Sequence, residues 1–208
     1  LFQNLRRAGS ELADGTPLLR AGDVLTPRSV AVLAEVGLDK VMVRPRPRVV
    51  VFTVGETLVE PGHALTAPQQ RYDATTALIT AAARADGATV YPLGVIPADA
   101  DAVRRVVNDQ QIRADLIVAI GGGGFVRGLT GARDVDEALV GLNGSAPIVT
   151  AALGEGRTPL VTLPAGVVSA YVAYLALVRP LVNKLNQVDP LAGPRVDARE
   201  HDERDAPV

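Results

Sequence analysis

Over residues 49–178, apolar β-branched runs alternate with segments that carry helix-capping signals. Val49–Val54 is one unbroken run of this kind, which is typical of a strand buried on both faces. Asp73 or Thr75 can cap a helix that runs to about Arg84. Alternation of strand and helix restricts the fold, because parallel neighbouring strands need a helical crossover between them.

The same pattern continues along the chain and predicts an α/β fold, a three-layer doubly wound and mainly parallel sheet. Sheets of this kind bind ligands at the carboxyl ends of their strands. The further predicted elements are a strand over Thr89–Val95, a helix that opens at Asp99 or Asp101, a strand over Asp115–Ile120, a helix over Arg133–Val140, a strand over Pro159–Leu163 and a helix over Val167–Val178.

Residues 1–47 form a separate first piece that ends in a stiff linker, and residues 48–180 form the α/β domain. In the first piece, Thr26 and Pro27 predict a helix start, since a hydroxyl cap followed by proline at the first helical position favours one. Lys40–Val43 is predicted to form a short strand.

The last stretch of the chain differs in composition from the α/β domain. Residues 181–208 are predicted to be an extension, and from Gly193 onward it is rich in charge and almost free of apolar residues. Such a segment cannot bury enough surface to fold, so a largely disordered tail is expected.

Composition excludes several functional classes. The net charge is −2, whereas a protein that neutralises phosphate backbones is usually basic, so nucleic acid is not the expected partner. There are no cysteines and only two histidines, His63 and His201, so we expect neither a thiolate nor a multi-histidine metal site. The chain begins at Leu1 without the pattern of a signal peptide, and a cytoplasmic location is expected.

One uncharged run, Thr158–Val178, is long enough to span a bilayer. Pro164, Ala165 and Gly166 interrupt it, and a strand–turn–helix unit explains this break better than a membrane helix does. We therefore expect no direct membrane insertion.

A row of four glycines, Gly121, Gly122, Gly123 and Gly124, directly follows an apolar strand. Residues without Cβ let the backbone approach a ligand and direct successive N–H groups at an anion. The spacing fits neither the dinucleotide fingerprint nor the phosphate-loop motif, since Leu129 stands where the latter needs lysine. The loop is either an anion cradle or a plain surface loop.

Two further segments leave strand ends and should meet the glycine loop in one pocket. Thr53, Gly55 and Glu56 follow the first sheet strand, and Glu56 either accepts hydrogen bonds from a ligand or is a solvated or capping acid. Pro164 and Ser169 follow the last strand. Asp73 is placed at the same site, although its position also suits a helix N-cap.

Four motifs in order resemble the molybdopterin molybdenumtransferase family, to which MoeA and gephyrin belong. These segments are Val54-Gly-Glu-Thr-Leu58 for the family's T-G-D-E-L, Arg71-Tyr-Asp73 for I-Y-D-S-N, Ile120-Gly-Gly-Gly-Gly124 for S-G-G-V-S, and Leu163-Pro-Ala-Gly-Val-Val-Ser-Ala170 for L-P-G-N-P-V-S-A. The resemblance implies a molybdopterin-binding α/β domain of molybdenum cofactor biosynthesis. It implies molybdopterin or its adenylylated form as ligand and leaves Mg²⁺ and molybdate open.

Departures from the family pattern bear on catalysis. Thr57 replaces the second acid of the first motif, Ile120 and Gly124 replace both serines of the third, and Leu129 replaces its aspartate. The family's lysine-bearing P-G-K-P segment has no counterpart, since residues 146–156 contain no lysine. Whether the chain is an enzyme is left open, because catalytic residues look lost.

The resemblance also suggests partners. Members of the family are dimers, so a homodimer that buries part of residues 1–47 is expected. The alternative function is a catalytically inactive, gephyrin-like scaffold that binds a peptide of a partner protein.

Overall fold

The chain divides into two units, Leu1–Pro45 and Arg46–Val208, in the computed structural model. The sequence predicts this boundary after residue 47. The structure describes residues 9–121, 123–126, 129, 132–138 and 148–187. The disordered tail predicted from Gly193 onward lies outside the described residues.

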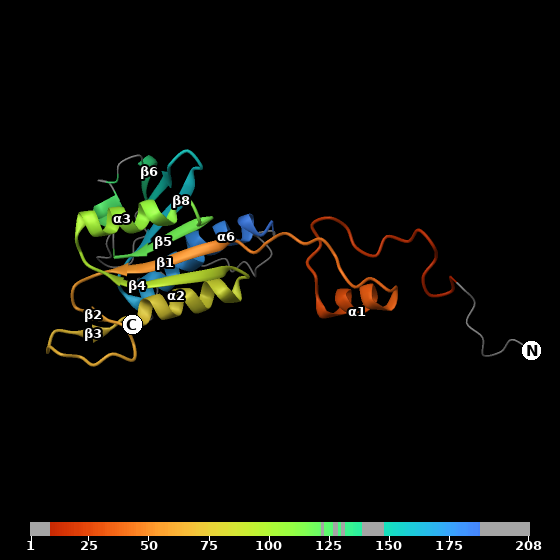
Figure 1. Ribbon diagram of the computed structural model, residues 1–208, viewed down its shortest axis with the longest axis horizontal. Helices are drawn as coiled ribbons and strands as arrows, with labels where there is room; N and C mark the ends of the chain where they lie inside the picture. The colour runs from red at the N-terminus through yellow and green to blue at the C-terminus, as the bar shows by residue number, and fades with distance from the viewer. Residues whose placement is uncertain (1–8, 122, 127–128, 130–131, 139–147, 188–208) are drawn as a thin grey trace, which may run out of the picture. The chain divides into compact units, whose positions relative to one another are not determined.

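Helices and strands alternate through most of the second unit (Figure 1). The first unit contains helix α1 (Pro27–Glu35). The helices described in the second unit are α2 (Ala74–Ala85), α3 (Ala100–Gln110), α4 (Gly123–Val126), α5 (Val167–Ala173), the π-helical segment η1 (Tyr174–Val178) and α6 (Arg179–Leu185). The strands are β1 (Arg48–Val54), β2 (Leu58–Val59), β3 (Arg71–Tyr72), β4 (Thr89–Ile96), β5 (Leu116–Ile120), β6 (Ala132–Ala138), β7 (Ile148–Leu153) and β8 (Thr158–Leu163).

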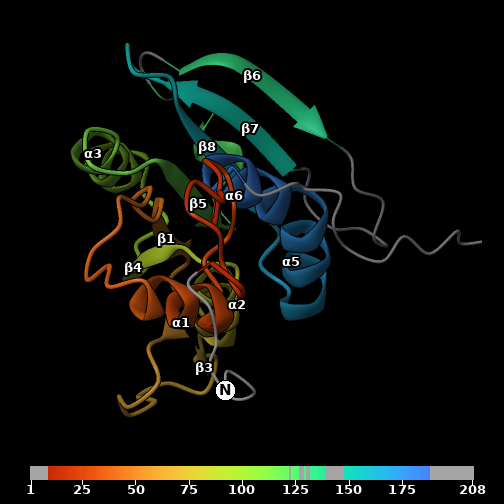
Figure 2. The ribbon, with the colours of Figure 1, turned by 90° about the vertical axis from the view of Figure 1, so that its right-hand side faces the viewer.

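Six strands form the main sheet in the order β4-β1-β5-β8-β7-β6. The pairs β4–β1, β1–β5 and β5–β8 are parallel, whereas β7 and β6 join antiparallel at one edge (Figure 2). This confirms the predicted doubly wound, mainly parallel α/β fold. After β1 the chain moves to β4 on one side, then returns through α3 to β5 on the other. The carboxyl ends of β1 and β5 therefore flank the switch point where such folds bind ligands.

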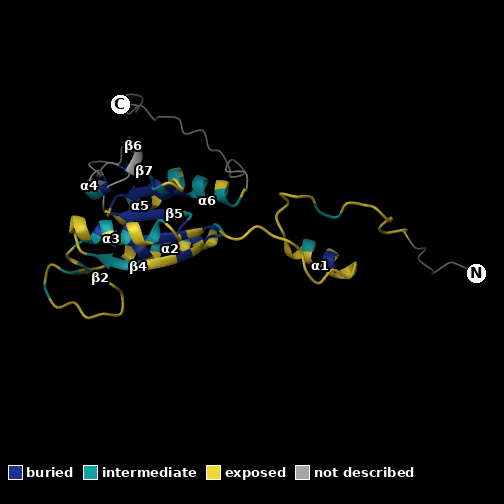
Figure 3. Ribbon diagram, turned by 45° about the horizontal axis from the view of Figure 1, so that its top comes forward, coloured by how far each residue is buried: buried dark blue, intermediate teal, exposed yellow. Residues whose placement is uncertain are grey.

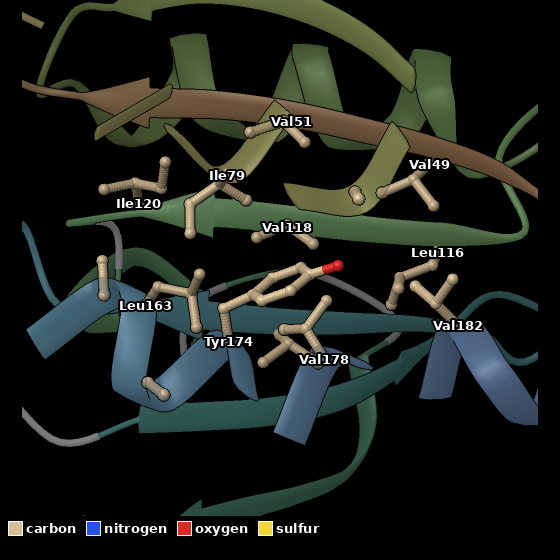
Figure 4. Close-up of a cluster of buried hydrophobic side chains, with 14 of the residues drawn as sticks. Val49, Val51, Ile79, Leu116, Val118, Ile120, Leu163, Tyr174, Val178 and Val182 are labelled. Carbon is tan, nitrogen blue, oxygen red and sulfur yellow. The ribbon is translucent and has the colours of Figure 1, made fainter. Parts of the chain in front are cut away.

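Strand β1 is buried from Val49 to Val54, as its sequence predicts. Its neighbour β5 is buried along its whole length (Figure 3). Val49 and Val51 face a cluster that contains residues of α2, α5, η1 and α6, of which Ile79 and Tyr174 are fully buried (Figure 4). Val50, Phe52 and Val54 face a second cluster, with α3 and α4. The period-two alternation of the strand thus distributes its side chains between two helical layers.

Two predicted elements are wrong, and several observed ones were not predicted, among them the short strands β2 and β3. Residues 132–138 form strand β6, not the start of a helix over 133–140, because their backbone pairs with β7; propensity is a weak guide where a neighbouring strand is available. Strand β7 was not predicted. Residues 40–43 belong to no strand, since nothing in the first unit's described residues pairs with them.

The α/β unit continues past residue 180, where the C-terminal extension was predicted to begin. Helix α6 runs to Leu185, and Val182 is fully buried in the first core cluster. The uncharged run at 158–178 forms strand β8 followed by α5 and η1. Within the described residues, no helix is both long and apolar enough to cross a bilayer.

In the first unit, helix α1 begins as predicted. Thr26 caps it, and Thr26 and Ser29 form a reciprocal capping box, with Pro27 at the first helical position. Leu33 is the one buried side chain among residues 9–45. Many of the unit's larger apolar side chains are exposed, Met42 fully so.

A polar cluster holds helix α2 to the last helices at the amino-terminal end of the sheet. The Tyr174 hydroxyl donates to Asp86 Oδ2 over 2.6 Å, and Arg179 Nε donates to the same oxygen over 2.9 Å. Asn186 Nδ2 donates to the Asp86 carbonyl. Burial, followed by the hydrogen bond to Asp86, raises the pKa of Tyr174 well above its usual range, so the hydroxyl remains a donor.

Replacing Tyr174 with phenylalanine tests this anchor. The variant Tyr174→Phe should lose about 1–2 kcal/mol of unfolding free energy, because a buried charge-assisted hydrogen bond is removed while Asp86 keeps Arg179. Urea denaturation measures the loss. The matched control is Tyr171→Phe, since Tyr171 stacks on Tyr174 but is partly exposed. Equal losses in the two variants would contradict the anchoring role.

Candidate functional site

Three loops leave the carboxyl edge of the sheet at the same level. Thr53 of β1 is in register with Ile120 of β5, and Ile120 is in register with Leu163 of β8. The residues that follow these positions are therefore brought together by the register alone. The sequence predicts that these same three loops converge.

The loops approach one another most closely at Gly121. Its N–H donates to the Leu163 carbonyl over 2.8 Å. An added Cβ would lie 3.0 Å from the Val54 carbonyl oxygen and 3.7 Å from Ala165 Cβ. Gly121 also has a φ of +78°, which strongly favours glycine. Only a residue without a side chain lets the three loops meet in this way.

Helix α2 is tied to the same edge through hydroxyl groups. The hydroxyls of Thr53 and Thr76 are 2.6 Å apart and buried, and the Thr75 hydroxyl donates to the Ala165 carbonyl over 3.2 Å. Asp73 is the helix N-cap, since its Oδ1 accepts from the backbone N–H groups of Thr75 and Thr76. The first turn of α2 thereby becomes a wall of the site.

The other predicted residues are placed as follows. Gly55 donates its N–H to the Ile96 carbonyl of β4, which extends the pairing of β1 with β4 by one residue. Glu56 is exposed beyond it. Pro164 is buried and Ser169 is half-buried in the first turn of α5.

In the glycine row, Gly123 and Gly124 begin the short helix α4, and Gly124 is exposed with open space where a Cβ would point. Gly122 lies outside the described residues.

Helix α5 begins beside Gly121 without a side-chain cap. Its N-cap is Gly166, which makes no side-chain hydrogen bond, and no acidic residue occupies the first turn. Amides at the start of a helix lack partners within the helix and carry a partial positive charge. Together with the glycine row, this arrangement can accept an anion.

Sequence reasoning missed Thr75 and Thr76. The sequence suggests Thr75 only as an alternative helix cap, but its hydroxyl makes a contact across 90 positions of the sequence. The one local signal is the spacing from Asp73, which places both threonines in a capped first turn. Leu129 is buried in the second core cluster, so it is a core residue of this fold.

No group of three or more metal-ligating side chains occurs in the part of the chain that the structure describes.

The fold and the convergent strand-end loops define a doubly wound α/β ligand-binding domain. Comparison with known proteins agrees: the family described as "Probable molybdopterin binding domain" matches residues 50–184. The chain therefore belongs to this family.

Similar proteins include molybdopterin molybdenumtransferase 1 of Mycobacterium tuberculosis, which is 33% identical over 188 residues. That alignment covers 86% of this chain but 43% of the relative, so the chain spans less than half of that protein's length.

Solved structures show the same fold. The molybdopterin biosynthesis MoeA protein of Pyrococcus horikoshii has a TM-score of 0.72 at 23% identity, covering 85% of this chain and 45% of that one. The tungsten cofactor synthesizing protein MoaB of Pyrococcus furiosus has a TM-score of 0.51 at 16% identity, covering 70% of this chain and 99% of that one.

A pair of alanine substitutions tests the close approach of the loops. Gly121→Ala should cost about 1–3 kcal/mol of unfolding free energy, because its positive φ and the nearby Val54 carbonyl both oppose a Cβ. Gly124→Ala should change stability by less than about 0.5 kcal/mol, because its Cβ enters open space. Chemical denaturation of both variants gives the comparison. A Gly121→Ala variant as stable as Gly124→Ala would contradict the geometry.

Proposed function

We propose that this chain is a molybdopterin-binding domain that holds the ligand's phosphate at the carboxyl edge of the sheet. The observation that carries the proposal is the convergence of the loops after β1, β5 and β8 at Gly121. Helix α5 begins after β8 without a side-chain cap, and exposed Gly124 lies at the start of the short helix α4, which follows β5. Backbone amides in such a place favour a phosphate without requiring a basic side chain.

Little molybdenum insertion is expected from the domain alone. Transfer chemistry needs preorganised charged groups, and removing one such group commonly costs about 10²–10³ in rate. Where the family pattern has serine or aspartate, this chain has Ile120 and Leu129, and both side chains are buried in the core. Binding to molybdopterin or its adenylylated form is therefore the proposed activity. The exposed apolar side chains of the first unit suit a second copy of this chain as well as a partner protein, so they do not favour the scaffold alternative.

Calorimetry with molybdopterin under anaerobic conditions tests the proposal. Gly124→Asp should weaken binding about tenfold or more, since a carboxylate would face the phosphate. Gly156→Asp is the matched control, because Gly156 lies in the β7–β8 turn at the opposite edge of the sheet and an added Cβ meets only Thr158 Oγ1, at 4.0 Å. Absence of binding to the unmodified chain, or equal affinity of the Gly124→Asp and Gly156→Asp variants, would overturn the proposal.

We also propose that the chain forms a homodimer through the first unit. Among residues 9–45 only Leu33 is buried, whereas Val30 is 56% exposed and Val43 is 64% exposed. Exposed apolar side chains gathered on one small unit are typical of an interaction surface, because so small a unit cannot cover them itself.

Light scattering over a wide range of concentration tests the dimer. The expected mass is about twice the 21.7 kDa of one chain, and Val43→Asp should shift the equilibrium toward the monomer because it places a charge in the apolar surface. Asp39→Ala, at an exposed polar position of the same unit, is the control. A mass of one chain at every concentration would exclude the dimer.

A further inference from the structure

The two threonines in the first turn of helix α2 reach different parts of the sheet edge. The Thr76 hydroxyl lies 2.6 Å from the hydroxyl of Thr53, the last but one residue of β1. The Thr75 hydroxyl donates to the Ala165 carbonyl, beyond the end of β8, over 3.2 Å. Strand β5 lies between β1 and β8 in the sheet. The first turn of α2 therefore spans the end of β5, which Gly121 follows.

The hydroxyl of Thr75 is available for this contact because Asp73 caps the helix. Asp73 Oδ1 accepts the N–H groups of Thr75 and Thr76, so the cap uses no threonine oxygen. Threonine hydroxyls near a helix start commonly bond their own backbone. Thr75 instead reaches a carbonyl 90 positions away in the sequence. The contact therefore joins α2 to the loop after β8 and is not part of the helix's own capping.

The direction of the Thr75 hydroxyl is set by the packing of α2 on the sheet. Only 4% of Thr75 is exposed. A buried hydroxyl is normally paired, because no bulk water reaches it. A β-branched side chain also has few favoured rotamers in a helix. The position of α2 therefore determines where the carbonyl that accepts this hydrogen bond has to lie.

This carbonyl belongs to an irregular turn. Residues 164–166 join β8 to α5 and lie in no helix or strand. Ala165, in the middle of the turn, is exposed. Backbone hydrogen bonds to the carbonyls of Leu163 and Gly166 hold the chain on either side of it. The Thr75 hydroxyl holds the residue between them.

A small shift of this turn would alter the candidate phosphate site. Ala165 Cβ lies 3.7 Å from the place that a Cβ on Gly121 would occupy, so the turn packs directly against the start of the loop after β5. The next residue, Gly166, is the N-cap of α5 and makes no side-chain hydrogen bond there. Groups that bind a ligand have to be held within about 0.5 Å of their working positions, which requires support from residues behind them.

We propose that Thr75 is a positioning residue of this site. Its hydroxyl fixes the turn at Ala165 and thereby fixes the spacing between the loops after β5 and β8, where the phosphate is proposed to bind. Thr75 itself does not touch the ligand, because its side chain is buried and its hydroxyl already has a partner. The inference deepens the proposed function and rests on it for the identity of the ligand.

Thr75→Val tests the inference, because valine keeps the shape of the side chain and removes the hydroxyl. Calorimetry of the full chain under anaerobic conditions measures its affinity for inorganic phosphate and for molybdopterin. Both affinities should fall about three- to tenfold, the range expected when one hydrogen bond is lost. Thr75→Ser retains the hydroxyl and should restore both affinities to within about twofold.

Thr158→Val is the matched control. The Thr158 hydroxyl donates to the Gln111 carbonyl over 2.9 Å, and Thr158 is 8% exposed, so the two threonines have the same kind of partner and similar burial. Thr158 is the first residue of β8, at the opposite end of the strand from the glycine row. Thr158→Val should lose as much stability toward urea as Thr75→Val does, but it should keep the affinity for both ligands.

Amide hydrogen exchange gives a second readout that needs no ligand. The Ala170 N–H donates to the Gly166 carbonyl over 2.8 Å, directly after Ala165, so its exchange reports on opening of the turn. Thr75→Val should speed this exchange about threefold or more relative to the slowest amides of β1. Thr158→Val should leave that ratio unchanged.

The outcomes separate this inference from the proposed function. If Thr75→Val binds both ligands as the unmodified chain does, or loses no more affinity than Thr158→Val, the inference is wrong and the proposed function stands. Failure of Thr75→Ser to restore the affinity would also overturn the inference, because the hydroxyl would then not be responsible. If neither ligand binds the unmodified chain, the proposed function is wrong. Faster exchange at Ala170 in Thr75→Val would then still support the fixing of the turn, and unchanged exchange would overturn it.

Discussion

The two-sided burial of strand β1 is the constraint on which the rest of the structure depends. Every residue from Val49 to Val54 is buried, and successive side chains face different helical layers. A strand of this kind must lie inside its sheet and needs helices on both faces. Strand β4 is added on one side of β1 and β5 on the other, so the order in which the chain adds parallel strands reverses at β1. The candidate phosphate site follows from that reversal.

Helix α2 gives this edge its rigidity, because it is held at both ends. Near its start, Thr76 contacts Thr53 and Thr75 contacts Ala165. At its end, Asp86 accepts hydrogen bonds from Tyr174 and Arg179. Its anchoring therefore fixes the position of its first turn, which forms a wall of the candidate site. Preorganisation of this kind lowers the entropic cost of binding a ligand.

The local chemistry of the sequence was sufficient to predict the centre of the fold. Apolar β-branched runs predicted β1, β5 and β8. Two candidate caps were predicted for each of α2 and α3, and the observed caps, Asp73 and Asp99, are among them. Strand β6 was not predictable in this way, because it pairs only with β7, which the sequence analysis did not identify. Strand β7 itself carries a short apolar run, and such runs do not distinguish strand from helix by periodicity.

The site was predictable only in part, for a related reason. Gly121 is conspicuous because a glycine row after an apolar strand is a local pattern. The hydroxyl contacts of Thr75 and Thr76 join residues that are 90 and 23 positions apart, so no local pattern signals them.

Binding and catalysis make different demands on this edge of the sheet. A phosphate can be held by backbone amides, which persist whatever side chains the loop carries. Transfer chemistry depends on particular side chains in fixed positions. Ile120 and Leu129 are buried in the two core clusters, where they add to packing and no longer offer polar groups to a ligand. The fold is thus compatible with phosphate binding without polar side chains at positions 120 and 129. The register of β1, β5 and β8 is sufficient to position the backbone amides of the loops that follow these strands.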